Sequence, residues 1–72
     1  MNNFDCTIVR NIASFDRSDN TKIEVNLIDY KGHGLRIDIR RWKKNPHTML
    51  KGVSLLPCEF NELKEVMQNE KI

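Results

Sequence analysis

The alternation of apolar and polar residues is clearest in two neighbouring segments, residues 21–30 and 35–42. Successive side chains of a β-strand point to opposite faces, so this pattern predicts two strands that each have one apolar face. The two glycines at positions 32 and 34 can adopt the positive φ values of a tight turn, which predicts a hairpin between the strands. The apolar positions of the two strands are Ile23, Val25, Leu27, Leu35, Ile37 and Ile39.

Weaker patterns predict three further elements. Residues 4–15 are rich in β-formers but alternate imperfectly, and residues 50–55 form a short fourth strand candidate. Pro57 suits the first turn of a helix, which we expect over residues 57–70. The apolar stripe of this helix indicates a core or a dimer interface, and it consists of Phe60, Leu63, Val66 and Met67.

The order of these elements predicts an α+β fold in a single domain, residues 1–72. We expect a four-stranded antiparallel twisted sheet followed by one C-terminal helix that covers one face of the sheet. A chain of 72 residues buries only about 60% of the surface that its unfolded form exposes. A symmetric homodimer would enlarge this small core, and we expect one.

Basic residues are concentrated in the middle of the chain. Residues 31–51 carry seven lysines and arginines and one acid, a formal charge of +6, whereas each flank carries −2. Residues 43–48 form a basic segment with a proline, which we expect to be a loop. A local positive field attracts polyanions, so nucleic acid is the partner class that this distribution favours.

Strand periodicity also sorts the aromatic residues. If the alternating apolar residues point inward, Tyr30, Arg36, Arg40 and Trp42 point to solvent. Aromatic rings stack on the exposed bases of a single strand, and neighbouring cations hold its phosphates. Two other interpretations stay open: Trp42 is buried against residues 43–49 or at a subunit contact, and Tyr30 packs on the neighbouring strand.

Enzymatic and metal sites have little support. His33 and His47 lack a nucleophile or carboxylate at a motif spacing, and the spacing of the histidines with Cys6 and Cys58 matches no zinc motif. We expect no enzyme activity, no cofactor and no metal. The sequence also contains no secretory leader pattern and no apolar run long enough for a membrane span, so we expect a cytoplasmic protein with no membrane partner. Association with the nucleoid stays open.

Three segments in order carry a resemblance to a known family. They are Asp-Tyr-Lys-Gly at 29–32, Ile-Asp-Ile-Arg-Arg-Trp at 37–42 and Lys-Gly-Val-Ser-Leu at 51–55. This pattern resembles the single-stranded-DNA-binding transcriptional coactivators called positive cofactor four, especially their short bacterial YdbC-type members. The resemblance is strongest over residues 29–55 and extends over residues 21–67.

The resemblance implies a symmetric dimer whose interface comprises Val53, Leu55, Phe60, Leu63, Val66 and Met67. It also implies base stacking by Tyr30 and Trp42 and basic contacts by Lys31, Arg40 and Lys51, with His33 where the family often has lysine. The alternation along the strand adds Arg36 to the candidate binding residues, and the basic segment of residues 43–48 adds Lys43 and Lys44. The candidate nucleic-acid-binding residues are therefore Tyr30, Lys31, His33, Arg36, Arg40, Trp42, Lys43, Lys44 and Lys51.

The sequence thus predicts sequence-tolerant binding of single-stranded DNA on a β-sheet, in transcription regulation or in protection of unwound DNA. The transcription machinery is a further expected partner. RNA and duplex DNA stay open as ligands. A protein-interaction module that uses the same aromatic face is the alternative from another functional class.

Overall fold

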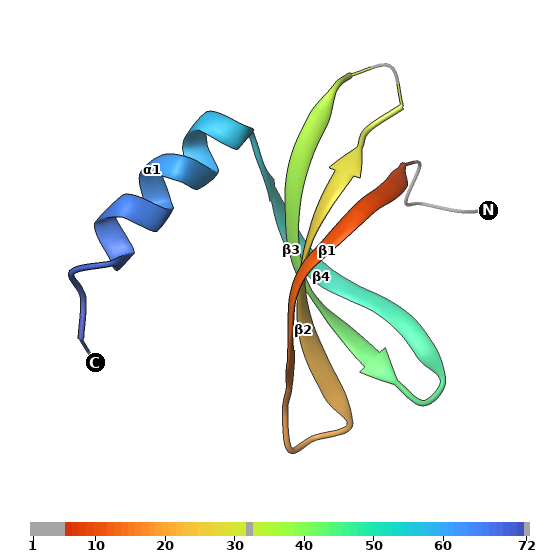
Figure 1. Cartoon of the computed structure of the whole chain (residues 1–72). Coiled ribbons are helices and arrows are strands. Elements are labelled where there is room, and N and C mark those ends of the chain that lie inside the picture. The colour runs from red at the N-terminus through yellow and green to blue at the C-terminus, as the bar shows by residue number, and fades with distance from the viewer. Residues whose placement is uncertain (1–5, 32, 72) are drawn as a thin grey trace.

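The computed structural model describes residues 6–31 and 33–71, which form four strands and one helix (Figure 1). In chain order the elements are β1 (Thr7–Asp16), β2 (Thr21–Asp29), β3 (Leu35–Lys44), β4 (His47–Leu55) and α1 (Pro57–Met67). The strands form one antiparallel sheet in the order β1-β2-β3-β4. The predicted fold of four antiparallel strands followed by a C-terminal helix is confirmed.

The central hairpin follows directly from the alternating sequence. β2 and β3 pair without interruption from Thr21 opposite Lys43 to Asp29 opposite Leu35. In the connection, the Tyr30 N–H donates to the Gly34 carbonyl at 2.9 Å. Gly34 has a φ of 89°, a conformation that glycine reaches without the steric cost of a Cβ.

The hairpin between β3 and β4 is tighter than expected, because only Asn45 and Pro46 separate the two strands. Most of residues 43–48, expected to be a loop, is strand instead. The turn between β1 and β2 supplies hydrogen-bond partners for this backbone: Lys44 N–H donates to the Asn20 carbonyl at 2.9 Å, and Asn20 Nδ2 donates to the Asn45 carbonyl at 3.1 Å. These bonds allow β3 and β4 to extend to the turn.

The imperfect alternation of the first strand also has a structural cause. The register of β1 against β2 shifts twice, between Ile8 and Arg10 and between Asn11 and Ala13. Each shift changes which residues face which side, so strict period two cannot hold along this strand. The part of the expected strand before Cys6 lies outside the described residues.

The two faces of the sheet differ in an unexpected way. We call them the Trp42 face, with Asn26, Ile28, Asp38, Arg40 and Trp42, and the Ile39 face, with Ile23, Val25, Leu27, Ile39 and Val53. The buried residues of the described chain lie mainly on the Trp42 face and include Asn26, Ile28, Asp38 and Trp42. On the Ile39 face, expected to be inside, Ile37 and Thr21 are buried, whereas the other apolar residues are half-buried or exposed. Strong twisting of the sheet, visible in Figure 1, lets the strands shield the Trp42 face.

The helix does not cover the sheet as expected. Figure 1 shows α1 leading away from it, and the helix touches only β3 and β4. Pro57 opens the helix, and the Leu56 N–H donates to Glu59 Oε1 at 2.8 Å. No residue of α1 is buried within the chain, and Val66 is 60% exposed. Among residues 6–31 and 33–71, the apolar stripe of the helix and most of the Ile39 face are therefore only partly covered.

Gly52 allows the close approach of β3 and β4. It lies opposite Arg40, just before a register shift in the pairing of the two strands. A Cβ at this position would overlap the Cβ of Arg40 and lie 2.6 Å from the Ile39 carbonyl oxygen. Both neighbours belong to β3, so relief would require moving the strand rather than a flexible side-chain end.

Replacing Gly52 with alanine should therefore destabilise the fold. We expect Gly52→Ala to lower the free energy of unfolding by about 1–3 kcal/mol, as overpacking does elsewhere, measured by urea denaturation at fixed protein concentration. Lys51→Ala at the exposed neighbouring position is the control and should change it by less than about 0.5 kcal/mol. Equal stability of Gly52→Ala and wild type would contradict the observed strand approach.

Candidate nucleic-acid interface

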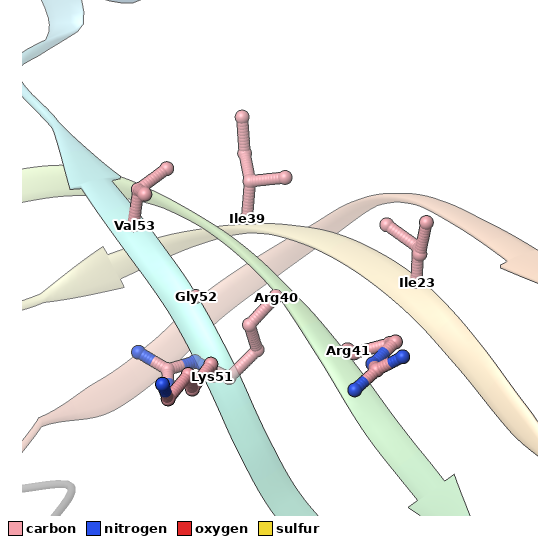
Figure 2. A pocket seen from close by; sticks show the side chains of 7 residues that line it. All are labelled: Ile23, Ile39, Arg40, Arg41, Lys51, Gly52 and Val53. Carbon is pink, nitrogen blue, oxygen red and sulfur yellow. The ribbon is translucent and has the colours of Figure 1, made fainter.

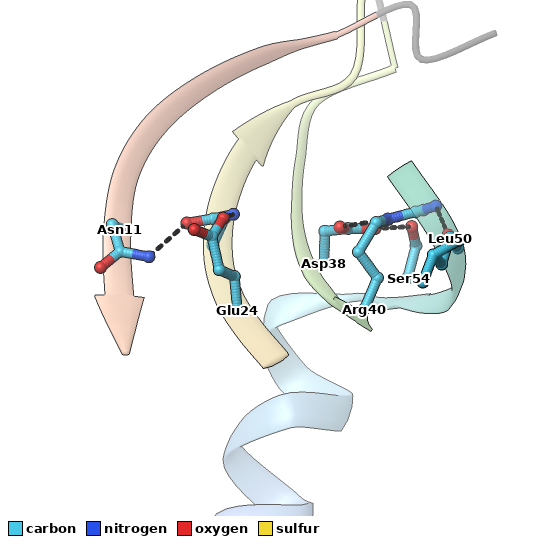
Figure 3. Close-up of polar contacts among 7 residues, drawn as sticks. Asn11, Glu24, Asp38, Arg40, Leu50 and Ser54 are labelled. Carbon is cyan, nitrogen blue, oxygen red and sulfur yellow. Dashed lines mark hydrogen bonds and ion pairs between the residues drawn. The ribbon is translucent and has the colours of Figure 1, made fainter. Parts of the chain in front are cut away.

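A row of polar side chains crosses the Trp42 face from one edge strand to the other. Asn11, Asn26, Asp38 and Ser54 are direct register partners across the three strand pairs. Asn11 Nδ2 donates to Asn26 Oδ1 at 2.7 Å, and Ser54 Oγ donates to Asp38 Oδ1 at 3.4 Å (Figure 3). Asn26 and Asp38 are almost fully buried. The middle of the row is thus internal, whereas its two ends, Asn11 and Ser54, are exposed.

Arg40 completes this row and is held by it. Its Nε and Nη2 donate to the two carboxylate oxygens of Asp38 at 2.7 and 2.8 Å, and Nη1 donates to the Leu50 carbonyl at 2.9 Å (Figure 3). Hydrogen bonding to Asp38 raises the pKa of Arg40 despite partial burial. The expectation that Arg40 projects freely into solvent is wrong, because its charge neutralises a fully buried carboxylate.

Glu24 joins the same network beside Asn26. Asn26 Nδ2 donates to Glu24 Oε1 at 3.1 Å, and Lys22 Nζ lies 2.8 Å from Oε2. Burial raises the pKa of Glu24, but the hydrogen bonds from Lys22 and Asn26 and the charges of Lys22 and His47 outweigh it, so the pKa lies below its ordinary value. Glu24 is therefore ionised and its charge is balanced locally near neutral pH.

Trp42 is buried, with 8% of its surface exposed, so the expectation that it faces solvent is wrong. The alternative, burial against residues 43–49, is correct. Its ring stacks on His47 with 4.7 Å between ring centroids and 3° between ring planes. The reason is the early start of β4: Trp42 is opposite Met49, so His47 becomes its diagonal neighbour on the same face.

A second aromatic cluster lies at the other end of the sheet, around the β2–β3 hairpin. Tyr30 is 42% exposed, and its ring centroid lies 5.5 Å from that of His33. Arg36 Nη1 donates to the carbonyls of His33 at 3.2 Å and of Leu35 at 3.1 Å. Lys31 is exposed beside them. The structure therefore brings four of the predicted site residues together here.

The remaining predicted lysines fall into two places. Lys43 and Lys44 are exposed near the Trp42–His47 pair, and Lys44 Nζ lies 3.7 Å from Asp16 Oδ1. Lys51 instead lines a depression of about 390 Å³ on the Ile39 face together with Arg41. Figure 2 shows the apolar lining residues of this depression, Ile23, Ile39 and Val53, projecting from the same side of the sheet.

The arrangement is thus two aromatic–histidine clusters with cations beside each. Tyr30 lies eight residues beyond Lys22, the register partner of Trp42, which is roughly 26 Å at about 3.3 Å per residue. Sequence reasoning missed His47 and Arg41. The spacing between Trp42 and His47 could have indicated their contact only if residues 43–48 had been predicted to form a hairpin. Arg41 and Lys51 line the same depression beside the register shift between β3 and β4, and no pattern in the sequence indicated this shift.

A comparison with protein families identifies the relatives of this fold. The family model for the transcriptional coactivator p15 (PC4) matches residues 17–66, well over half of the chain. The chain belongs to this family. No curated protein and no solved structure gives a significant match.

The p15 (PC4) family comprises single-stranded-DNA-binding transcriptional coactivators and is non-enzymatic. The matched segment contains all nine candidate nucleic-acid-binding residues, both aromatic–histidine clusters and most of α1. Within residues 6–31 and 33–71, no group of histidine, cysteine and carboxylate side chains is placed to hold a metal ion. The same residues form no helix that is long and apolar enough to cross a membrane.

In this p15 (PC4) family member, the structural role of Arg40 can be separated from that of Arg36, a half-buried arginine that donates to backbone carbonyls. We expect Arg40→Gln to lower the free energy of unfolding by about 3–5 kcal/mol, because it leaves the buried Asp38 carboxylate uncompensated. Arg36→Gln is the control and should cost less than about 1 kcal/mol.

Urea denaturation of the two variants and of Asp38→Asn/Arg40→Gln measures these effects. The double variant should recover part of the stability lost in Arg40→Gln, since it removes the uncompensated charge. Equal, small losses in Arg40→Gln and Arg36→Gln would show that the ion pair does not support the fold.

Proposed function

We propose that this chain binds single-stranded DNA in a sequence-tolerant manner, as a homodimer that acts in transcription regulation or protects unwound DNA. The observation that supports this most is the pair of aromatic–histidine clusters at opposite ends of one sheet, each with lysines or arginines beside it. Family membership supports the same ligand class.

The chemistry of the two clusters suits an unpaired strand. Each base stacked on an aromatic ring contributes roughly 1–3 kcal/mol, whatever the base, whereas a duplex hides the faces of its bases. The separation of roughly 26 Å between the clusters fits the site sizes of about 4–16 nucleotides that OB folds use. A strand that follows β2 and β3 would reach both clusters.

Phosphate contacts fall to the exposed or half-buried cations near each cluster. Lys31 and Arg36 serve the Tyr30 end, and Lys44 serves the Trp42 end. Strand alternation puts Lys43 on the opposite face, where it adds to the positive field. His33 adds a donor beside Tyr30. Arg40 acts through Asp38 as a structural residue, and Lys51 with Arg41 contributes to the positive field from the Ile39 face.

Dimerisation is supported by the apolar surface that the single chain leaves uncovered. The six predicted interface residues are all half-buried or exposed: Val53, Leu55, Phe60, Leu63, Val66 and Met67. Helix α1 contains no buried residue, although its stripe is apolar. Its acidic residues also complement Arg41 and Lys51 beside the depression on the Ile39 face. A second copy would cover both apolar surfaces at once.

Sedimentation equilibrium at micromolar concentration tests the dimer. We expect twice the 8.5 kDa chain mass for wild type and the monomer mass for Leu63→Glu, because a buried unpaired carboxylate would oppose association. Gln68→Glu, at an exposed position after the helix, is the control and should stay dimeric. A monomeric wild type would remove the homodimer from the proposal.

Fluorescence anisotropy of a labelled oligothymidine of about 20 nucleotides tests the ligand. We expect the wild type to bind it more tightly than the matching duplex, and affinity to fall with salt by a log–log slope of about −0.7 per phosphate contact. Tyr30→Ala should weaken binding roughly tenfold through the loss of one stack. Phe15→Ala, at an exposed aromatic on β1, is the matched control and should bind like wild type.

Two results would contradict the proposal. One is no binding of oligothymidine by folded wild type at low salt, and the other is equal affinity for duplex and single strand. The matching oligouridine, run in parallel, decides between DNA and RNA as the preferred ligand.

A further inference from the structure

His47, rather than Trp42, carries the accessible aromatic surface at the β3–β4 end of the sheet. Trp42 is 8% exposed, whereas His47 is an exposed residue stacked on it. With 3° between the ring planes, the imidazole covers the face of the indole on that side. A base that approaches this end from solvent therefore meets the imidazole before the indole.

The backbone holds His47 in this position. It is the first residue of β4 and pairs with Lys44 immediately before the two-residue turn. Thr48 Oγ1 donates to the Pro46 carbonyl at 3.0 Å, and Asn20 Nδ2 donates to the Asn45 carbonyl at 3.1 Å. The turn is thus braced on both sides, so the imidazole is placed in advance and binding requires no rearrangement.

We propose that His47 is a base-stacking residue, seated on Trp42, which supports the imidazole from beneath and contacts no base itself. This inference rests on the proposed binding of single-stranded nucleic acid. It assigns a role to a residue that the sequence pattern did not select, and it explains how a buried tryptophan serves a stacking site. Lys44, exposed beside the pair and opposite His47, then holds the phosphate of the stacked nucleotide.

A matched pair of substitutions separates stacking from other roles. His47→Phe keeps a flat ring over Trp42, whereas His47→Leu covers Trp42 with a side chain that has no π-face. We expect His47→Phe to bind oligothymidine within about twofold of wild type and His47→Leu to bind roughly tenfold more weakly. Phe15→Leu removes an exposed ring on β1, outside both clusters, and serves as the control that should bind like wild type.

The opposite order would overturn the inference. If the base displaces His47 and stacks on Trp42, the leucine variant should bind more tightly than the phenylalanine variant, because a phenyl ring is the harder of the two to displace. If His47 acts only as a cation, both variants should lose affinity equally and the salt slope should fall. Oligothymidine binding with no effect of either variant also rejects the role of His47, but leaves the proposed function intact. No binding by wild type rejects both.

Proton NMR of the wild type provides a second measurement. The ring protons of His47, assigned with His47→Phe, should be shifted upfield by the Trp42 ring current in the free protein, unlike those of His33. Adding oligothymidine should shift the His47 protons further upfield, because the base adds a second ring current. A downfield shift toward the values of an unstacked imidazole would show displacement and contradict the proposal.

Discussion

The burial of Asp38 is the constraint on which the rest of this sheet depends. A carboxylate that is fully removed from solvent requires a partner charge, and Arg40, two residues along the same strand, supplies it with two hydrogen bonds. Asp38 also fixes the register on both sides, opposite Asn26 on β2 and Ser54 on β4. A slip of one residue in either pairing would move these polar groups to the other face and leave the carboxylate without them.

This internal polar row explains where the functional surfaces lie. Because the middle of the Trp42 face is occupied by its own hydrogen bonds, open aromatic and basic groups remain at its two ends, around Tyr30 and around His47. In the part of the chain that the structure describes, most of the Ile39 face and the apolar stripe of α1 are half-buried or exposed. The proposed nucleic acid binding and the proposed dimerisation thus involve different surfaces of one small sheet.

The sequence predicted the elements well and the burial of their faces poorly. Alternation from Ile23 to Ile39 correctly placed β2 and β3 and put Arg40 and Trp42 on one face. It could not tell which face is enclosed, because Asn26 and Asp38 look like solvent-facing residues until their cross-strand partners are known. His47 was missed because its contact with Trp42 depends on a turn shorter than the pattern indicated. Helix packing was misjudged because an apolar stripe predicts that a helix is covered but does not say which surface covers it.

Amide chemical-shift mapping of the labelled protein with oligothymidine tests most directly whether a single strand runs along the Trp42 face from one hairpin to the other. The account predicts that the largest shifts fall in two groups, around Tyr30 to Arg36 and around Trp42 to Thr48, and that an oligonucleotide too short to span roughly 26 Å perturbs only one group at a time. Shifts confined to Arg41, Lys51 and the rest of the Ile39 face would contradict it.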